Sequence, residues 1–171
     1  ADEDRRRYLF VAIDRATGWV FARISPAQTA ANARRLLRGL ERAAPMKISR
    51  VLTDNGKAFT DRLFGLRKRA SGQHEFDLLS AELCIGAASR PQTNGMVERI
   101  NGLIEDVLHS HRFHSGEDLE QTILRYVHLH NRPFPQSALN ARTLIGTLQD
   151  WQRHRPELSR KRVYNLAGCD T

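Results

Sequence analysis

The apolar residues of this 171-residue chain change their spacing near Thr29, and this change limits the fold more than any other feature. Residues 8–13 form a compact apolar run and residues 19–24 alternate, a pattern typical of strands, with a turn-forming segment at 14–18 between them. We therefore expect an antiparallel hairpin. Beyond Thr29 the apolar residues recur at helical spacing. They are Ala30, Ala33, Leu36, Leu37, Leu40 and Ala44, and Pro45 ends the helix.

The remaining segments follow an order that predicts a mixed α/β fold, a sheet covered by helices. We expect short strands at 48–53 and 84–88, and helices at 60–70, 76–83, 95–107, 118–130 and 144–151. The buried stripe of the long helix after residue 95 consists of Val97, Ile100, Ile104 and Val107. In open sheets of this kind, binding residues gather at the carboxyl ends of strands, and Asp54 stands at such an end.

The charge of the chain favours a polyanionic partner. Twenty-seven Lys and Arg against nineteen Asp and Glu leave a net charge of +8. Such an excess favours nucleic acid, because neutralised phosphates release counterions. No apolar run reaches the roughly 20 residues needed to cross a bilayer, and two distant cysteines, Cys84 and Cys169, suggest no disulfide framework. We expect a cytoplasmic protein without a membrane partner. The charged start without an initiator Met suggests a processed product or a fragment.

Two acidic residues are candidates for metal binding, and each has an ordinary structural explanation. Asp54 lies in Leu-Thr-Asp-Asn-Gly, which is also a good turn sequence. Glu98 follows Gly95 at the start of the long helix, where the helix dipole by itself stabilises an acid. Carboxylates are hard ligands suited to Mg²⁺ or Mn²⁺. A two-metal phosphoryl-transfer site needs several converging carboxylates, so these two acids leave both interpretations open.

The segments around these acids resemble a known family. Residues 51–59, Val-Leu-Thr-Asp-Asn-Gly-Lys-Ala-Phe, are similar to the second-Asp motif of DDE transposases and retroviral-type integrases. Residues 89–102, Ser-Arg-Pro-Gln-Thr-Asn-Gly-Met-Val-Glu-Arg-Ile-Asn-Gly, resemble their Glu motif as found in bacterial insertion-sequence transposases. Residues 8–21 resemble the hairpin of those cores, and residues 131–133, 135–139 and 142–143 resemble their C-terminal stretch. The similarity covers nearly the whole chain.

This resemblance implies a ribonuclease-H-like fold, with a mixed sheet flanked by helices, and DNA transposition or integration as the function. Two Mg²⁺ (or Mn²⁺) ions would be held by Asp54 and Glu98 with a further carboxylate. Lys57, Asn94 and Arg99 would contact DNA. Element ends and target DNA would be the partners of a homo-oligomer, located in the bacterial cytoplasm with the nucleoid. Residues 1–131 would form the core and residues 132–171 a basic, partly helical extension.

The third carboxylate of the family lies on the first of three strands before the first helix. This chain offers only two strands before Thr29, so residues 8–13 correspond to the second strand and Asp14 to the turn Asp that follows it. We therefore expect the first strand, with the first catalytic Asp, upstream of residue 1. Asp14 as the third ligand is the alternative.

Two other functions remain open. One is a ribonuclease-H-like nuclease, which shares metal and fold, and the other is a non-catalytic DNA-binding or assembly module. The histidines at 109, 111, 114, 128 and 130 lack a cysteine pair that would complete a zinc site, and we interpret them as solvated. The basic run at 160–162 either contacts DNA phosphates or forms a solvated tail.

Overall fold

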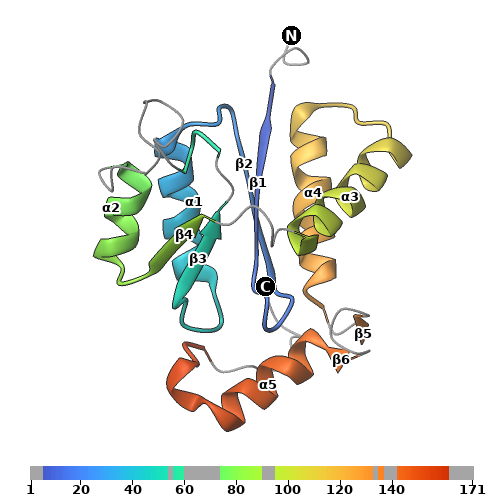
Figure 1. The fold of residues 1–171 in the computed structure, drawn as a ribbon. Coiled ribbons are helices and arrows are strands. Elements are labelled where there is room, and N and C mark those ends of the chain that lie inside the picture. Colours follow the sequence, from blue (N-terminus) through green and yellow to red (C-terminus); the bar gives the residue numbers. More distant parts are fainter. Residues whose placement is uncertain are drawn as a thin grey trace.

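The computed structural model describes residues 6–53, 56–59, 74–89, 95–132, 135–136 and 142–161. The elements follow one another in the expected order (Figure 1), and most bounds differ from expectation by only a few residues. The helix expected at 60–70 lies outside the described residues. The elements are β1 (Tyr8–Ile13), β2 (Val20–Ser25), α1 (Ala30–Ala43), β3 (Arg50–Thr53), α2 (Glu75–Glu82), β4 (Gly86–Ser89), α3 (Gly95–Ser110), α4 (Gly116–His130), β5 (Pro135–Gln136), β6 (Arg142–Thr143), α5 (Leu144–His154) and the 3-10 helix η3 (Pro156–Leu158).

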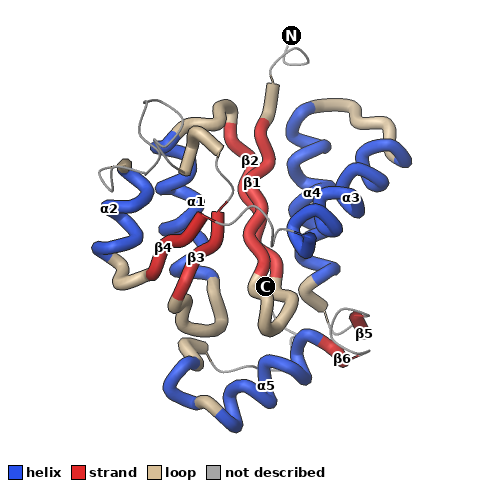
Figure 2. Tube along the Cα trace, in the orientation of Figure 1, coloured by secondary structure: helices blue, strands red, loops and turns tan. Residues whose placement is uncertain are grey.

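The β1–β2 hairpin forms a wall between two hydrophobic cores. Its strands pair antiparallel, with Tyr8 opposite Ser25 and Ile13 opposite Val20. Successive side chains of a strand point to opposite faces, so Phe21 packs against the core of α1 while Val20 packs against the core of α3 and α4. Figure 2 shows α1 and α2 on one side of the hairpin and α3 and α4 on the other.

The first core is built on the apolar stripe of α1. Thr29 begins the helix, because its side chain accepts a hydrogen bond from the Asn32 backbone N at 3.3 Å. Ala33, Leu36, Leu37 and Leu40 are buried, as the helical spacing predicted. Edge-to-face contacts join Phe59 to Phe10 and to Phe76, with ring centroids 6.0 and 5.2 Å apart. Aromatic pairs in this geometry stabilise a core beyond their buried area.

The second core lies between the hairpin and helices α3 and α4. Val20, Ile100, Ile104, Ile123 and Val127 are buried together.

At the C-terminal end of α4, the Asn131 amide donates to the Val20 carbonyl at 2.7 Å and accepts from the Val20 backbone N at 2.9 Å. The amide thus takes the place of a neighbouring strand and satisfies backbone groups that would otherwise lack partners.

The described strands pair in three separate two-stranded ladders, and with the helices they make up the mixed α/β class that the sequence predicted. β3 and β4 pair parallel, with Arg50 opposite Gly86 and Thr53 opposite Ser89, and β5 pairs antiparallel with β6. Among the residues that the structure describes, no ladder joins β1 to β3. The described strands therefore form two antiparallel pairs and one parallel pair.

The segment after residue 142 packs against the end of the hairpin and of α1. Leu144, Ile145 and Leu148 of α5 contact Trp19 and Met46.

Beyond η3, the side chains of Arg160 and Lys161 donate to the carbonyls of Glu41 and Ala43, at 2.5 and 3.2 Å. The last carbonyls of a helix lack partners within it, so these basic side chains cap α1. Both residues remain exposed while they make these contacts, and Arg162 lies outside the described residues.

None of the helices in the described ranges combines the length and the apolar character needed to span a membrane.

Candidate metal and DNA site

The structure describes three of the five residues assigned to the site. Asp54 and Asn94 lie outside the described residues, which reach Thr53 at the end of β3 and resume at Gly56. Glu98 stands in the first turn of α3 with an exposed side chain, followed by the exposed Arg99. Lys57 is exposed in a turn that is closed by a hydrogen bond from the Phe59 backbone N to the Gly56 carbonyl at 2.9 Å.

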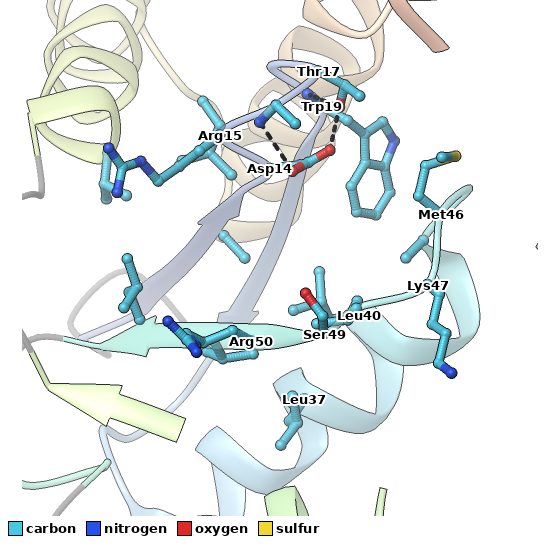
Figure 3. Close-up of a pocket in the computed structure, with 18 of the residues that line it drawn as sticks. Asp14, Arg15, Thr17, Trp19, Leu37, Leu40, Met46, Lys47, Ser49 and Arg50 are labelled. Carbon is cyan, nitrogen blue, oxygen red and sulfur yellow. Dashed lines mark hydrogen bonds between the residues drawn. The ribbon is translucent and has the colours of Figure 1, made fainter. Parts of the chain in front are cut away.

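A cavity of about 710 Å³ lies between β1 and β3. Val11 to Asp14 of the hairpin and Arg50 to Thr53 of β3 form two of its walls, and Leu36, Leu37 and Leu40 of α1 line it as well (Figure 3). Thr53 directly precedes Asp54, while Met96 and Val97 directly precede Glu98, and all three line this cavity. The two segments that precede the candidate acids therefore border one common space.

The lining role of Met96 and Val97 was not visible in the sequence. Helical spacing assigned Val97 to a buried stripe, and the structure leaves it only partly buried at the cavity wall. Gly95, the first residue of α3, is compatible with close approach of a substrate, but no local pattern indicates which strand lies opposite.

The Asp14 carboxylate is engaged by its own turn. It accepts hydrogen bonds from the Ala16 backbone N at 3.1 Å and from the Thr17 hydroxyl at 2.5 Å (Figure 3). The Asp14 backbone also pairs with Trp19 and Gly18, each at 2.8 Å. Gly18 has a φ of 75°, in the left-handed region that favours glycine. These contacts fit the turn-stabilising role of an Asp at such a position.

Asp14 also lies at the wrong end of the cavity to join Asp54. β1 and β3 run in roughly opposite directions (Figure 1), so the residue after β1 lies at the end where β3 begins. Figure 3 shows Asp14 and Trp19 on the side of the cavity where Met46 and Lys47 precede β3. Asp54 follows the other end of that strand. The geometry thus favours the turn interpretation of Asp14.

His130 lies next to the same turn. Burial lowers the pKa of its imidazole, and a hydrogen bond with the Gly18 backbone partly offsets this effect. Within the described parts of the chain, no group of three His, Cys, Asp or Glu side chains is arranged to hold a metal ion.

Comparison with protein families identifies the central part of the chain. The family model of the integrase core domain matches residues 79–143. This span contains β4, α3 and α4 with Glu98, and it leaves out the hairpin and Asp54. It confirms the resemblance over these residues and supports a role in transposition or integration in general. The similarity of residues 79–143 to the integrase core domain thus supports an integrase or transposase catalytic core, and that domain implies a ribonuclease-H-like fold.

Proposed function

We propose that Asp54 and Glu98 hold divalent metal, Mg²⁺ or Mn²⁺, for the cutting and joining of DNA in transposition or integration. The observation that carries the proposal is the cavity that borders both acid-bearing segments, through Thr53 on one wall and Met96 and Val97 on the other. The integrase core match across Glu98 supports it.

Glu98 fits the role of a metal ligand. Its carboxylate is exposed, and no side chain among the described residues pairs with it. Carboxylate oxygens are the hard ligands that Mg²⁺ and Mn²⁺ prefer. Divalent ions held by these carboxylates would supply charge neutralisation at the phosphate and alignment of the attacking and leaving oxygens. Water attacks the phosphodiester at an element end, and the 3′-hydroxyl that is released then attacks target DNA, so each step exchanges one P–O bond for another.

Positioning of the DNA would come from polar side chains beside the acids. Lys57 and Arg99 are exposed close in sequence to Asp54 and Glu98, and Asn94 directly precedes α3. We assign to them contacts with DNA phosphates, because basic and amide groups bind phosphate oxygens without reading sequence. Joining of paired element ends calls for more than one copy of the chain, which we propose assembles on DNA in the cytoplasm.

The third carboxylate would lie on one further strand between β1 and β3. Such a strand would lie in the cavity between β1 and β3 and would cover the apolar side of α1. Pairing antiparallel with β1 makes it parallel to β3, so its carboxyl end would reach the Asp54 end of the sheet. That is also the end where β1 begins (Figure 1), so a short hairpin turn could connect the two. We place this strand in a segment joined upstream of residue 1.

The experiment compares residues 1–171 with a chain extended upstream, in a Mg²⁺-dependent assay with a labelled element end. We expect strand transfer by the extended chain only, and its loss in Asp54→Asn and Glu98→Gln. Strand transfer by residues 1–171 alone would instead support Asp14 as the third ligand. Hydrolysis without joining would indicate the nuclease, and salt-sensitive DNA binding that Asp54→Asn does not alter, without any chemistry, would indicate the DNA-binding module.

A further inference from the structure

The side of α1 that faces away from the cavity carries a row of arginines. Arg35, Arg38 and Arg42 follow one another at spacings of three and four residues, so they share one face of the helix. All three are exposed, whereas Leu36, Leu37 and Leu40 occupy the opposite, buried side and line the cavity. We call this surface, together with Arg23, the arginine face.

Arg23 reaches this surface from the hairpin. A Cβ atom added at Gly39 would lie 3.1 Å from Cζ of Phe21 and 3.9 Å from Nη1 of Arg23. Gly39 stands between Arg38 and Arg42 on α1, so the Arg23 guanidinium lies beside the row. The absence of a side chain at Gly39 lets the helix pack closely against the strand. Two separate elements thus contribute cations to one surface.

Little negative charge offsets these cations. Glu41 pairs with Arg160 at 2.5 Å, and Glu75 pairs with Arg34 at 3.2 Å. Arg35 makes a 3.3 Å hydrogen bond to the Asn32 side chain, which is neutral. Within the described ranges, no acidic side chain forms an ion pair with Arg23, Arg38 or Arg42.

The chemistry of this surface fits the phosphate backbone of duplex DNA. Seven residues of helix span about 10 Å, which is about three phosphates of one strand at roughly 3.4 Å each. Guanidinium groups bind phosphate oxygens in a bidentate manner.

We propose that the arginine face binds the backbone of a second stretch of duplex DNA, on the side of α1 opposite the Glu98 site. The proposal rests on the proposed function only in taking DNA as the substrate. Contact with phosphates alone makes this binding independent of sequence. It would anchor DNA flanking the reacting end, or target DNA, while the chemistry proceeds elsewhere.

The test measures the affinity of the whole 171-residue chain for a labelled duplex of arbitrary sequence over a range of salt concentrations. One variant combines Arg35→Gln, Arg38→Gln and Arg42→Gln. Its matched control combines Arg112→Gln, Arg125→Gln and Arg153→Gln, which removes the same charge from exposed positions elsewhere. We expect the first variant to bind about tenfold or more weakly at low salt and to lose about two to three units of salt slope. The control should keep its slope within about one unit.

Equal losses in both variants would overturn the proposal, because net charge alone would then explain binding. An unchanged slope in the first variant would overturn it as well. A changed oligomeric state without DNA, measured by analytical ultracentrifugation, would show that the surface joins copies of the chain instead. The Lys substitutions at the same three positions should retain most of the slope, and thermal unfolding checks that each variant is folded.

Glu98→Gln separates this proposal from the catalytic one. In the chain extended upstream, strand transfer that survives Glu98→Gln would refute the catalytic assignment and leave the proposal for the arginine face standing. If strand transfer were lost in Glu98→Gln while the arginine substitutions left DNA binding unaffected, the catalytic assignment would stand and the arginine-face proposal would be refuted.

Discussion

The turn after β1 and the start of α3 both carry an acidic residue at the edge of one cavity, and their surroundings differ. At the turn, Asp14 accepts two hydrogen bonds from residues 16 and 17. Asn131 binds both backbone groups of Val20 just beyond it, and His130 contacts Gly18. Glu98 is exposed and has no such partners among the described residues. A carboxylate whose oxygens already accept hydrogen bonds serves the fold, whereas one left to solvent is available to a ligand.

The largest expected effect concerns activity. In the extended chain, Glu98→Gln should lower the strand-transfer rate by at least about a hundredfold, because a neutral amide is a poor ligand for Mg²⁺. Asp14→Asn should leave the rate within about a few-fold, since the proposed metal site does not include Asp14 and the amide oxygen can still accept a hydrogen bond in the turn. Single-turnover kinetics on a labelled DNA end measures both. Comparable losses of rate in the two variants would show that the Asp14 turn and the start of α3 do not differ in their role in catalysis.

The next effect concerns the link between α4 and the hairpin. Asn131→Ala leaves the N–H and carbonyl of Val20 without a partner, so we expect the free energy of unfolding to fall by about 2–3 kcal/mol. Denaturant titration followed by circular dichroism measures this change. Asn101→Ala is the matched control, because Asn101 is exposed on α3. A loss no larger than in the control would show that the two hydrogen bonds contribute little.

Removal of the turn carboxylate should have a smaller effect. Asp14→Ala eliminates the hydrogen bonds to the Ala16 N–H and to the hydroxyl of Thr17, a residue only 1% exposed. We expect a loss of about 1–2 kcal/mol in the free energy of unfolding. Asp14→Asn should recover only part of it in the same denaturant titration, because its one amide oxygen can accept one of the two hydrogen bonds. If Asp14→Asn were as unstable as Asp14→Ala, charge rather than hydrogen bonding would be the cause.

The smallest effect is a pH dependence at the same turn. Burial holds the pKa of His130 below its ordinary value of 6.5 in the folded chain. Above pH 6.5 the His130 imidazole is mostly neutral in both the folded and the unfolded chain, so it adds little pH dependence to stability. As the pH falls below this value, the unfolded chain takes up the proton first, and stability is lost until the folded pKa is reached. Melting curves between about pH 8 and pH 5 should therefore show a smaller decline in His130→Gln than in the unmodified chain.

His128→Gln provides the control for this experiment, since His128 is exposed on the same helix. Its melting temperatures should follow those of the unmodified chain throughout. An equal change in both variants would mean that the acid sensitivity does not come from burial beside Gly18.

Local patterns in the sequence predicted most of the elements. Alternation placed Phe21 and Val20 on opposite faces of the hairpin, and both now lie in separate cores. Helical spacing identified the buried stripe of α1 and the buried Ile100 and Ile104 of α3. These predictions succeed because burial of a strand or helix face depends on residues that are close along the chain.

The candidate site was predictable only in part. Its Glu motif led to the family, and the integrase core match covers that motif. The role of Asp14 followed from the count of strands, and its hydrogen bonds agree with the turn interpretation. The assignment of Asp54, Glu98 and the DNA-contacting residues remains a prediction, since Asp54 lies outside the described residues.

The sequence by itself determined the element order, the inward faces of the helices and the family resemblance. Only the tertiary structure decided that Asn131 pairs with Val20 across 111 positions and that Arg160 caps α1 across 119. It also decided that β1 and β3 stand on opposite sides of a cavity. The physical reason is that a polar side chain can satisfy many backbone groups equally well. Which group becomes its partner depends on how apolar faces far apart in the sequence pack together, and the local spacing of apolar residues does not predict that packing.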